Sequence, residues 1–213
     1  MTLRIAFLGY GNVGGPLADQ WQRLGHDVTL ATANPDSETA RALVARNPRL
    51  RIAPPADAIA PADVVVVAIP FKALEGTLAP LRDALAGKIL IDCVNPVGPG
   101  LTHGLESKRS GSETIQALLP ATRVVKAFSI YGYENFEDNR FPAANVRPAM
   151  LFCGDDADAK ATVGGLIAEL GWEPVDVGGL VQALHLEHMT LLWVRMVRAG
   201  QQSPHLTWAR LAR

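Results

Sequence analysis

The stretch IAFLGYGNVGGPLA, residues 5–18, packs four glycines into seven positions directly after an apolar run. Three of these glycines, Gly9, Gly11 and Gly14, have the spacing G-x-G-x-x-G. The apolar run predicts a β-strand, and the amphipathic stretch that follows predicts a helix ending at Gly25. A glycine-rich turn that leads from a strand into a helix is the context in which the phosphates of a dinucleotide bind.

Each glycine has a physical role in such a turn. Gly9 allows the tight turn, Gly11 lets the backbone approach a pyrophosphate group, and Gly14 lets the helix pack closely against the strand. The helix then directs its free N–H groups at the phosphates. We therefore expect a cofactor site at this turn, which also includes the intervening residues Tyr10, Asn12 and Val13.

Segments of strand length alternate with stretches of helical period along the rest of the chain. Strands are predicted at 4–9, 27–31, 62–70, 88–94 and 123–129. The third of them contains VVVVAI, which is apolar without alternation and therefore has both faces covered, as in a parallel sheet between helices. The pattern predicts an α/β fold, a Rossmann-type doubly wound parallel sheet.

The last third of the chain predicts a small C-terminal α/β extension. It contains predicted strands at 149–154 and 172–177, each followed by a predicted helix. We expect residues 1–145 to form a dinucleotide-binding domain and residues 146–213 to form a small domain that completes the acceptor cleft. The segments 96–112 and 131–148 lack a sustained period, and they predict long loops at the rim of the sheet.

The composition limits the range of partners. The formal net charge of −1 gives no field that attracts nucleic acid or anionic lipid, so a small-molecule redox acceptor is expected. No apolar run reaches the length of a membrane helix, and no leader pattern is seen, which predicts a cytoplasmic protein without a membrane partner. Cys93 and Cys153 match no metal or redox spacing and are expected to be buried free thiols. The C-terminal run LLWVRMVRAG suits either a homodimer contact or a core helix.

The end of the second predicted strand bears on the choice between NAD and NADP. An acidic side chain usually binds the ribose hydroxyls of NAD at this position, but the sequence here contains none. Thr32 and Asn34 offer neutral hydrogen bonds, and Asp36 comes too late for the ribose role. NADP(H) is therefore the expected cofactor.

Two later segments are expected to hold the nicotinamide ring, because each follows the carboxyl end of a predicted strand. The first contributes Ile69, Pro70 and Phe71, and the second contributes Asn95 and Pro96. An apolar wall with one amide group is suited to holding such a ring.

Several short segments carry a resemblance over nearly the whole chain. In order they are FLGYGNVGGPLA, VVVVAIPFKAL, DCVNP, VVKAFS, CGDDADAK, ELGW and LHLEH. Together they resemble the NADP oxidoreductases that depend on the deazaflavin coenzyme F420. The resemblance implies reversible hydride transfer between NADP(H) and a second redox carrier beside the C-terminal section. The same fold family includes the cytoplasmic portion of membrane ferric reductases, which pairs NADPH with a flavin, so a flavin or ferric acceptor stays an alternative.

The sequence departs from that family pattern at two places. NADP-binding members commonly have Ser-Arg at the end of the second strand, where this chain has Ala33 and Asn34. The archaeal deazaflavin enzymes have a histidine near the acceptor, where this chain has Ser129. The first change removes a guanidinium group that would bind the 2′-phosphate.

Hydride transfer needs two rings held close together and few acids or bases. A flavin or deazaflavin gains negative charge at its N1 edge on reduction, so a donor there would help. Lys126, Ser129 and Tyr131 are the candidates, with two alternatives: the Lys126 stem covers the sheet edge, or Tyr131 anchors a loop. A protein that binds NADP(H) only as a redox sensor is the remaining functional alternative.

His185 and His188 lie three residues apart and would share one helix face, which is compatible with a metal site. The sequence offers no third ligand beside them, so a structural histidine pair is expected and no metal is assigned.

Overall fold

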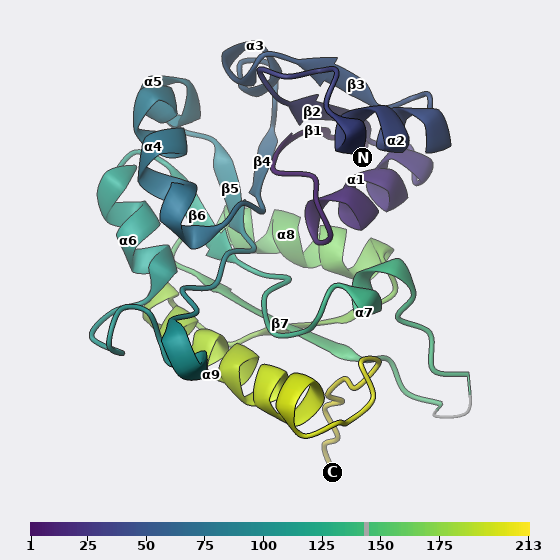
Figure 1. Cartoon of the computed structure of the whole chain (residues 1–213), viewed down its shortest axis with the longest axis vertical. Helices are drawn as coiled ribbons and strands as arrows, with labels where there is room; N and C mark the ends of the chain where they lie inside the picture. Colours follow the sequence, from purple (N-terminus) through teal and green to yellow (C-terminus); the bar gives the residue numbers. More distant parts are fainter. Residues whose placement is uncertain (143–144) are drawn as a thin grey trace.

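The computed structural model describes residues 1–142 and 145–213, and it contains one eight-stranded sheet (Figure 1). The strand order is β3-β2-β1-β4-β5-β6-β7-β8. Strands β1 to β6 run parallel, β7 pairs antiparallel with β6, and β8 runs parallel to β7. The predicted fold class, a doubly wound α/β sheet, is confirmed.

The strands match the apolar segments of the sequence closely. They are β1 Arg4–Leu8, β2 Asp27–Ala31, β3 Arg51–Ala53, β4 Val64–Val67, β5 Ile89–Asp92, β6 Arg123–Lys126, β7 Ala149–Gly154 and β8 Glu173–Asp176. Only β3 was not predicted, since it has three residues and no apolar run.

The helices cover both faces of the sheet. They are α1 Gly14–Arg23, α2 Glu38–Arg46, α3 Pro55–Ile59, α4 Leu74–Leu78, α5 Arg82–Leu85, α6 Gly111–Leu118, α7 Glu134–Glu137, α8 Ala157–Glu169 and α9 Ala183–Val194, with short 3₁₀ turns between several of them and a π-helical turn, Arg195–Ala199, after α9. Figure 1 shows α4, α5 and α6 on one side of the sheet and α1 on the other.

Strand β4 shows why a run of valines without alternation belongs in this sheet. Val64 and Val66 pack into the core on the face of α1, α2 and α8, whereas Val65 and Val67 pack into the core on the face of α3 to α6. All four valines are fully buried. Successive valines therefore pack against helices on opposite faces of the sheet.

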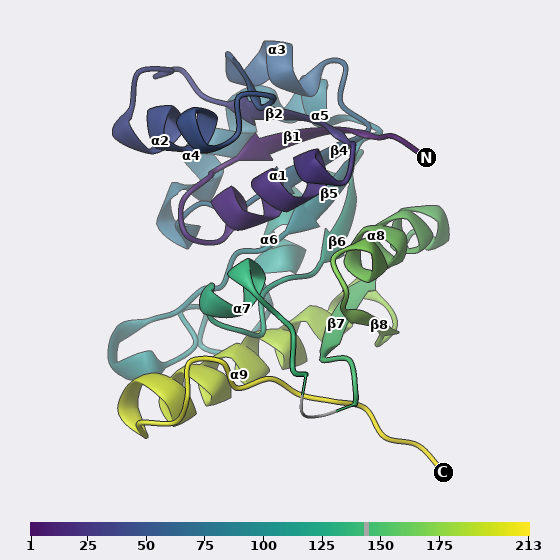
Figure 2. The ribbon, with the colours of Figure 1, turned by 90° about the vertical axis from the view of Figure 1, so that its right-hand side faces the viewer.

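The C-terminal section continues the same sheet, since β7 pairs with β6, and Figure 2 shows β7 and β8 next to α8 and α9. The division into domains at residue 145 stays a prediction. The predicted loop 96–112 contains a 3₁₀ turn at Pro99–Leu101 and a single β-bridge between Val97 and His103, and α6 begins near its end at Gly111. The predicted loop 131–148 contains the short helix α7, and its residues 143–144 lie outside the described part. Among the described residues, no helix has the length and apolar character needed to cross a membrane.

Candidate functional site

The site lies where the strand order changes direction, between β1 and β4. From β1 the chain continues to β2 on one side, and from β4 it continues to β5 on the other. In open parallel sheets, ligands bind beside the carboxyl ends of the strands at such a point. The glycine turn follows β1, and the segments with Ile69 and Asn95 follow β4 and β5.

Of the three glycines of the G-x-G-x-x-G pattern, two leave no room for a Cβ atom and one leaves room for it. Gly9 has a φ of +93°, and a Cβ there would collide with the carbonyl oxygen of Ala68. A Cβ on Gly14 would collide with the carbonyl oxygen of Gly9. A Cβ on Gly11 would meet no described atom within 4 Å. Gly9 and Gly14 are therefore needed for the turn itself, whereas Gly11 leaves room for a ligand to lie against the backbone.

The N-terminus of α1 is suited to a phosphate group. Within the described residues, no side chain caps this end of the helix, because Val13 occupies the capping position. Pro16 has no N–H and the Gly15 N–H donates to the Gly11 carbonyl oxygen at 2.8 Å, so the Gly14 N–H is left for a ligand at the positive end of the helix dipole. A groove of about 500 Å³ flanks the turn and is lined by Tyr10, Gly11, Asn12 and the facing residues of α2. These features fit the pyrophosphate of a dinucleotide.

The turn after β2 presents neutral groups, as the sequence indicates. The Thr32 hydroxyl accepts a hydrogen bond from the backbone N–H of Asn34 at 3.0 Å. Ser37 caps α2 and lies 3.4 Å from the Tyr10 hydroxyl, which ties this turn to the glycine turn. Ala33 and Asn34 are both exposed.

The two segments predicted to hold the ring meet one another. Ile69 lies directly against the position of Gly9, so the first segment touches the glycine turn. Phe71 and Pro96 lie within 3.2 and 3.4 Å of the place where a Cβ on Gly111 would be. The structure thus brings both segments together at the start of α6.

Asn95 is held by two hydrogen bonds. Its amide nitrogen donates to the carbonyl oxygen of Ser129 at 3.0 Å, and its amide oxygen accepts from the Thr190 hydroxyl at 3.1 Å. Thr190 also lies 2.8 Å from the Ser129 carbonyl oxygen. Asn95 therefore has a fixed orientation and one amide hydrogen left for a ligand. No pattern in the sequence indicates Thr190, which lies on the distant helix α9.

The turn after β6 contains a strained residue. Phe128 has a φ of +54°, which is costly for a bulky side chain, and it is fully buried. Its ring packs edge-on against Trp21 and Phe136, at centroid distances of 5.5 and 6.1 Å. This packing holds the next residue, Ser129, whose buried hydroxyl has no hydrogen-bond partner among the described residues. Strain next to an unpartnered polar group is typical of a functional site.

Tyr131 anchors its loop to the rest of the protein, which was the alternative to a role as donor to the acceptor. Its hydroxyl donates to the Ala149 carbonyl oxygen at 2.6 Å and accepts from the backbone N–H of Trp208 at 3.1 Å. Its ring stacks on Trp172 at 5.2 Å, and burial raises the pKa of the hydroxyl well above its usual range. The hydroxyl is thus used inside the protein.

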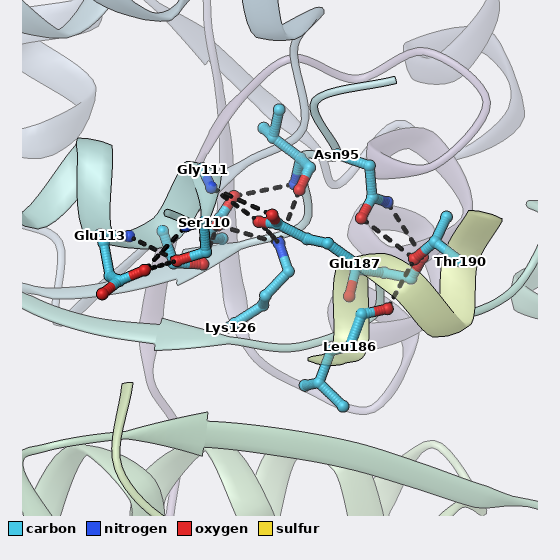
Figure 3. Close-up of polar contacts among 12 residues, drawn as sticks. Asn95, Ser110, Gly111, Glu113, Lys126, Leu186, Glu187 and Thr190 are labelled. Carbon is cyan, nitrogen blue, oxygen red and sulfur yellow. Dashed lines mark hydrogen bonds and ion pairs between the residues drawn. The ribbon is translucent and has the colours of Figure 1, made fainter. Parts of the chain in front are cut away.

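Lys126 lies in a buried cluster of charges with Asp92 and Glu187. Its ammonium group is 3.2 Å from each carboxylate and donates to the Val94 carbonyl oxygen at 2.7 Å. Figure 3 shows this ammonium group directed at Glu187. Burial acts to lower the pKa of Lys126, but the charges of Asp92 and Glu187 outweigh it and raise the pKa. The two interpretations from the sequence were a donor beside the acceptor and a lysine whose stem covers the sheet edge. The structure corrects the second, because the ammonium group is fully buried.

Glu187 connects this cluster to α6 and to the loop before it. Its carboxylate accepts from the Gly111 N–H at the start of α6, at 2.9 Å, and from His103 Nε2 at 2.8 Å. Asp92 accepts from the Ser112 hydroxyl at 2.6 Å. We term Asp92, His103, Lys126 and Glu187 the buried ion cluster. Asp92 and Glu187 were missed, although a carboxylate inside the apolar strand ILIDCV was a usable signal.

The histidine pair and the cysteines do not form metal sites in the part of the chain that the structure describes. His185 and His188 are exposed, and His188 stacks on the buried His103 at 5.4 Å. Cys93 and Cys153 are buried free thiols, as predicted, and burial raises the pKa of Cys153 to about 12.

Comparison with known proteins identifies relatives that match most of the chain. A family model described as NADP oxidoreductase, coenzyme F420-dependent, matches residues 4–96. The crystal structure of a protein assigned as an F420-dependent NADP reductase from Arthrobacter sp. FB24 is 30% identical, with a TM-score of 0.84 over 93% of this chain and 95% of that one.

Two curated proteins are similar over longer or shorter parts. Metalloreductase STEAP3 of Rattus norvegicus is 31% identical over 88% of this chain, which covers 36% of that protein. The F420-dependent NADP reductase of Methanocaldococcus jannaschii is 29% identical over 65% of this chain and 63% of its own length. The chain therefore spans about a third of the first protein and less than two thirds of the second.

Proposed function

Since the chain belongs to the family of coenzyme F420-dependent NADP oxidoreductases, we propose that it transfers hydride between NADP(H) and a deazaflavin or flavin-type acceptor. The observation that carries this proposal is the glycine turn, in which Gly9 and Gly14 are sterically obligatory and Gly11 is open to a ligand. Such a turn at an uncapped helix N-terminus suits a pyrophosphate.

In this proposal, the residues of the site mainly position the cofactor. Thr32 and Asn34 contact the ribose and its 2′-phosphate, and the backbone of the glycine turn holds the pyrophosphate. Ile69 and Phe71 form an apolar wall for the nicotinamide ring, and Asn95 directs its remaining amide hydrogen toward the ring's carboxamide. NADP(H) supplies the hydride chemistry, and the protein contributes orientation and exclusion of water.

Ser129 is the proposed contact to the acceptor. Its hydroxyl is buried, has no partner among the described residues and follows the strained Phe128. A hydroxyl donor at this place would stabilise negative charge that develops on the acceptor ring. Lys126 and Tyr131 are proposed to act by positioning, since their polar groups have internal partners.

The test is NADPH oxidation by the purified protein, followed by loss of the dihydronicotinamide absorbance. The acceptors are a deazaflavin, FMN, FAD and a ferric chelate, each also tested with NADH. Turnover with the deazaflavin supports the family's activity. Binding of NADPH without turnover with any of these acceptors would contradict the proposal and favour a redox sensor.

A second candidate function is reduction of a flavin or of ferric iron. It is favoured by the similarity to the metalloreductase, which extends over 88% of this chain, and by Ser129 at the place of the histidine found in archaeal deazaflavin enzymes. Turnover with FMN, FAD or ferric chelate alone would select this function.

A further inference from the structure

The buried ion cluster carries an excess of negative charge. Asp92 and Glu187 each contribute −1, and Lys126 contributes +1. His103 is neutral, because its Nδ1 accepts hydrogen bonds from the N–H groups of Leu105 and Ser107, both at 3.2 Å, which leaves the proton on Nε2. The cluster therefore has a net charge of −1, and its four side chains are at most 2% exposed.

This charge lies directly behind the proposed ring wall. A Cβ on Gly111 would be 3.2 Å from the Glu187 carboxylate, 3.2 Å from the Phe71 ring and 3.4 Å from Pro96. The carboxylate and the wall are thus separated by one glycine. Lys126 also bonds to the carbonyl oxygen of Val94, the residue before Asn95. Because the cluster is shielded from water, its charge acts over this distance with little screening.

The two redox forms of nicotinamide differ in charge. When hydride leaves C4 of the reduced ring with both electrons of the C–H bond, the neutral ring becomes a cation and the acceptor gains the hydride. We propose that the net negative charge of the buried ion cluster makes this site bind NADP⁺ more tightly, relative to NADPH, than a neutral cluster would. This inference rests on the proposed function. Preferential binding of the oxidised form makes bound NADPH a stronger hydride donor.

The experiment measures the dissociation constants of NADP⁺ and NADPH separately, by titration of protein fluorescence at about pH 8, where imidazole groups are neutral. The readout is the ratio Kd(NADPH)/Kd(NADP⁺), which is independent of turnover. In Glu187→Gln the cluster is neutral, and Coulomb's law across one side-chain layer predicts that the ratio falls roughly four- to fifteenfold. In Glu187→Gln/Lys126→Met the net charge returns to −1, and the ratio should return toward that of the wild type.

A matched control removes a carboxylate elsewhere. Glu169→Gln makes the same substitution at the end of α8, where Glu169 pairs with His26. The ratio should not change in this variant. Circular dichroism and melting temperature establish that each variant is folded before titration.

A second pair of variants avoids buried positions. His188 is exposed and stacks on His103, so it tolerates substitution beside the cluster. His188→Lys should lower the ratio and His188→Glu should raise it, each by roughly twofold because water screens an exposed charge. Opposite shifts support the inference even if Glu187→Gln does not fold.

An unchanged ratio in folded Glu187→Gln would overturn the inference, and so would shifts of the same sign in both His188 variants. If the wild-type protein binds neither NADP⁺ nor NADPH, the proposed function itself fails, and that result is distinct from a constant ratio.

Discussion

The glycine turn and the buried ion cluster flank the same site, but they are built in different ways. The turn comes from seven consecutive residues, 9–15, and it works through the backbone. The cluster comes from side chains of β5, β6, α9 and the loop before α6, which are brought together only by the fold. The glycine turn depends on residues that have no Cβ atom, and the buried ion cluster depends on the balance of its charges.

The difference determines how each region fails. In the turn, a single added carbon at Gly9 or Gly14 collides with backbone that cannot move away. In the cluster, the shape can be kept while the loss of one charge leaves its partners buried without compensation. Steric and electrostatic substitutions therefore separate the two regions experimentally.

The largest effect is expected for Lys126→Met, which leaves Asp92 and Glu187 buried beside one another. The free energy of unfolding should fall by about 3–5 kcal/mol, because one partner of a buried pair has been removed. Urea unfolding followed by circular dichroism measures this change. A loss below about 1 kcal/mol would mean that a carboxylate of the cluster is protonated in the native protein.

A somewhat smaller effect is expected for Gly14→Ala. Its Cβ would collide with the Gly9 carbonyl oxygen, so the free energy of unfolding should fall by about 3 kcal/mol. Gly11→Ala is the matched variant, because its Cβ meets no described atom within 4 Å. It should fold normally and lose NADPH affinity. Equal stability of the two variants would remove the steric distinction between the glycines.

The sequence was sufficient to predict most of the fold and the glycine turn. Strand β4 could be predicted because a continuous run of valines without alternation indicates a strand that is buried on both faces of a parallel sheet. Gly9, Gly11 and Gly14 were visible because their spacing is local. Helix α6 and strand β3 were missed, because α6 follows a loop rich in Gly, Ser and Pro and β3 has three residues.

The buried ion cluster and the turn at Phe128 could not be predicted from the sequence, since both depend on tertiary contacts. Lys126 was named as a candidate donor to the acceptor, but it lies at the end of strand β6 and its partner Glu187 lies on helix α9, so no local spacing connects the two. The positive φ of Phe128 has no signature in the sequence, because a bulky residue there is allowed only by its packing against Trp21. Charge balance and strain are properties of the folded chain.

A change of cofactor preference tests the neutral turn after β2. Asn34 is exposed, and Asn34→Arg would place a guanidinium group where the proposal puts the 2′-phosphate. The affinity for NADPH should rise about tenfold, or about 1.4 kcal/mol, and the affinity for NADH should stay constant. Isothermal titration with both cofactors measures this. An equal gain for NADH would show that the added charge acts on the pyrophosphate instead.

Strain at Phe128 predicts an unusual order of stabilities. Phe128→Ala and Phe128→Gly both lose the ring that packs on Trp21 and Phe136, so both should be strongly destabilised. At an ordinary position alanine is the more stable replacement, but at a φ of +54° glycine should be more stable by about 1 kcal/mol. Thermal unfolding of the two variants decides the matter. A more stable alanine variant would show that this turn relaxes.

The smallest effect is expected for an exposed ion pair, Arg4–Asp63, at the opposite ends of the strands. The hydrogen bond from Arg4 holds the pKa of Asp63 below its usual value, and both side chains are at least 36% exposed. Because the folded-state pKa is the lower one, the pair stabilises the protein above the pKa of the unfolded state. This contribution is lost as the pH falls through the folded-state pKa. Asp63→Asn should therefore lower the free energy of unfolding slightly at neutral pH and leave it unchanged at low pH.

The difference between Asp63→Asn and the wild type should disappear in about 1 M salt, because salt screens exposed charges, whereas the effect of Lys126→Met should persist there. A persistent effect of Asp63→Asn in high salt would show that its hydrogen bond to the Arg4 backbone N–H, and not the ion pair, is the source of stability.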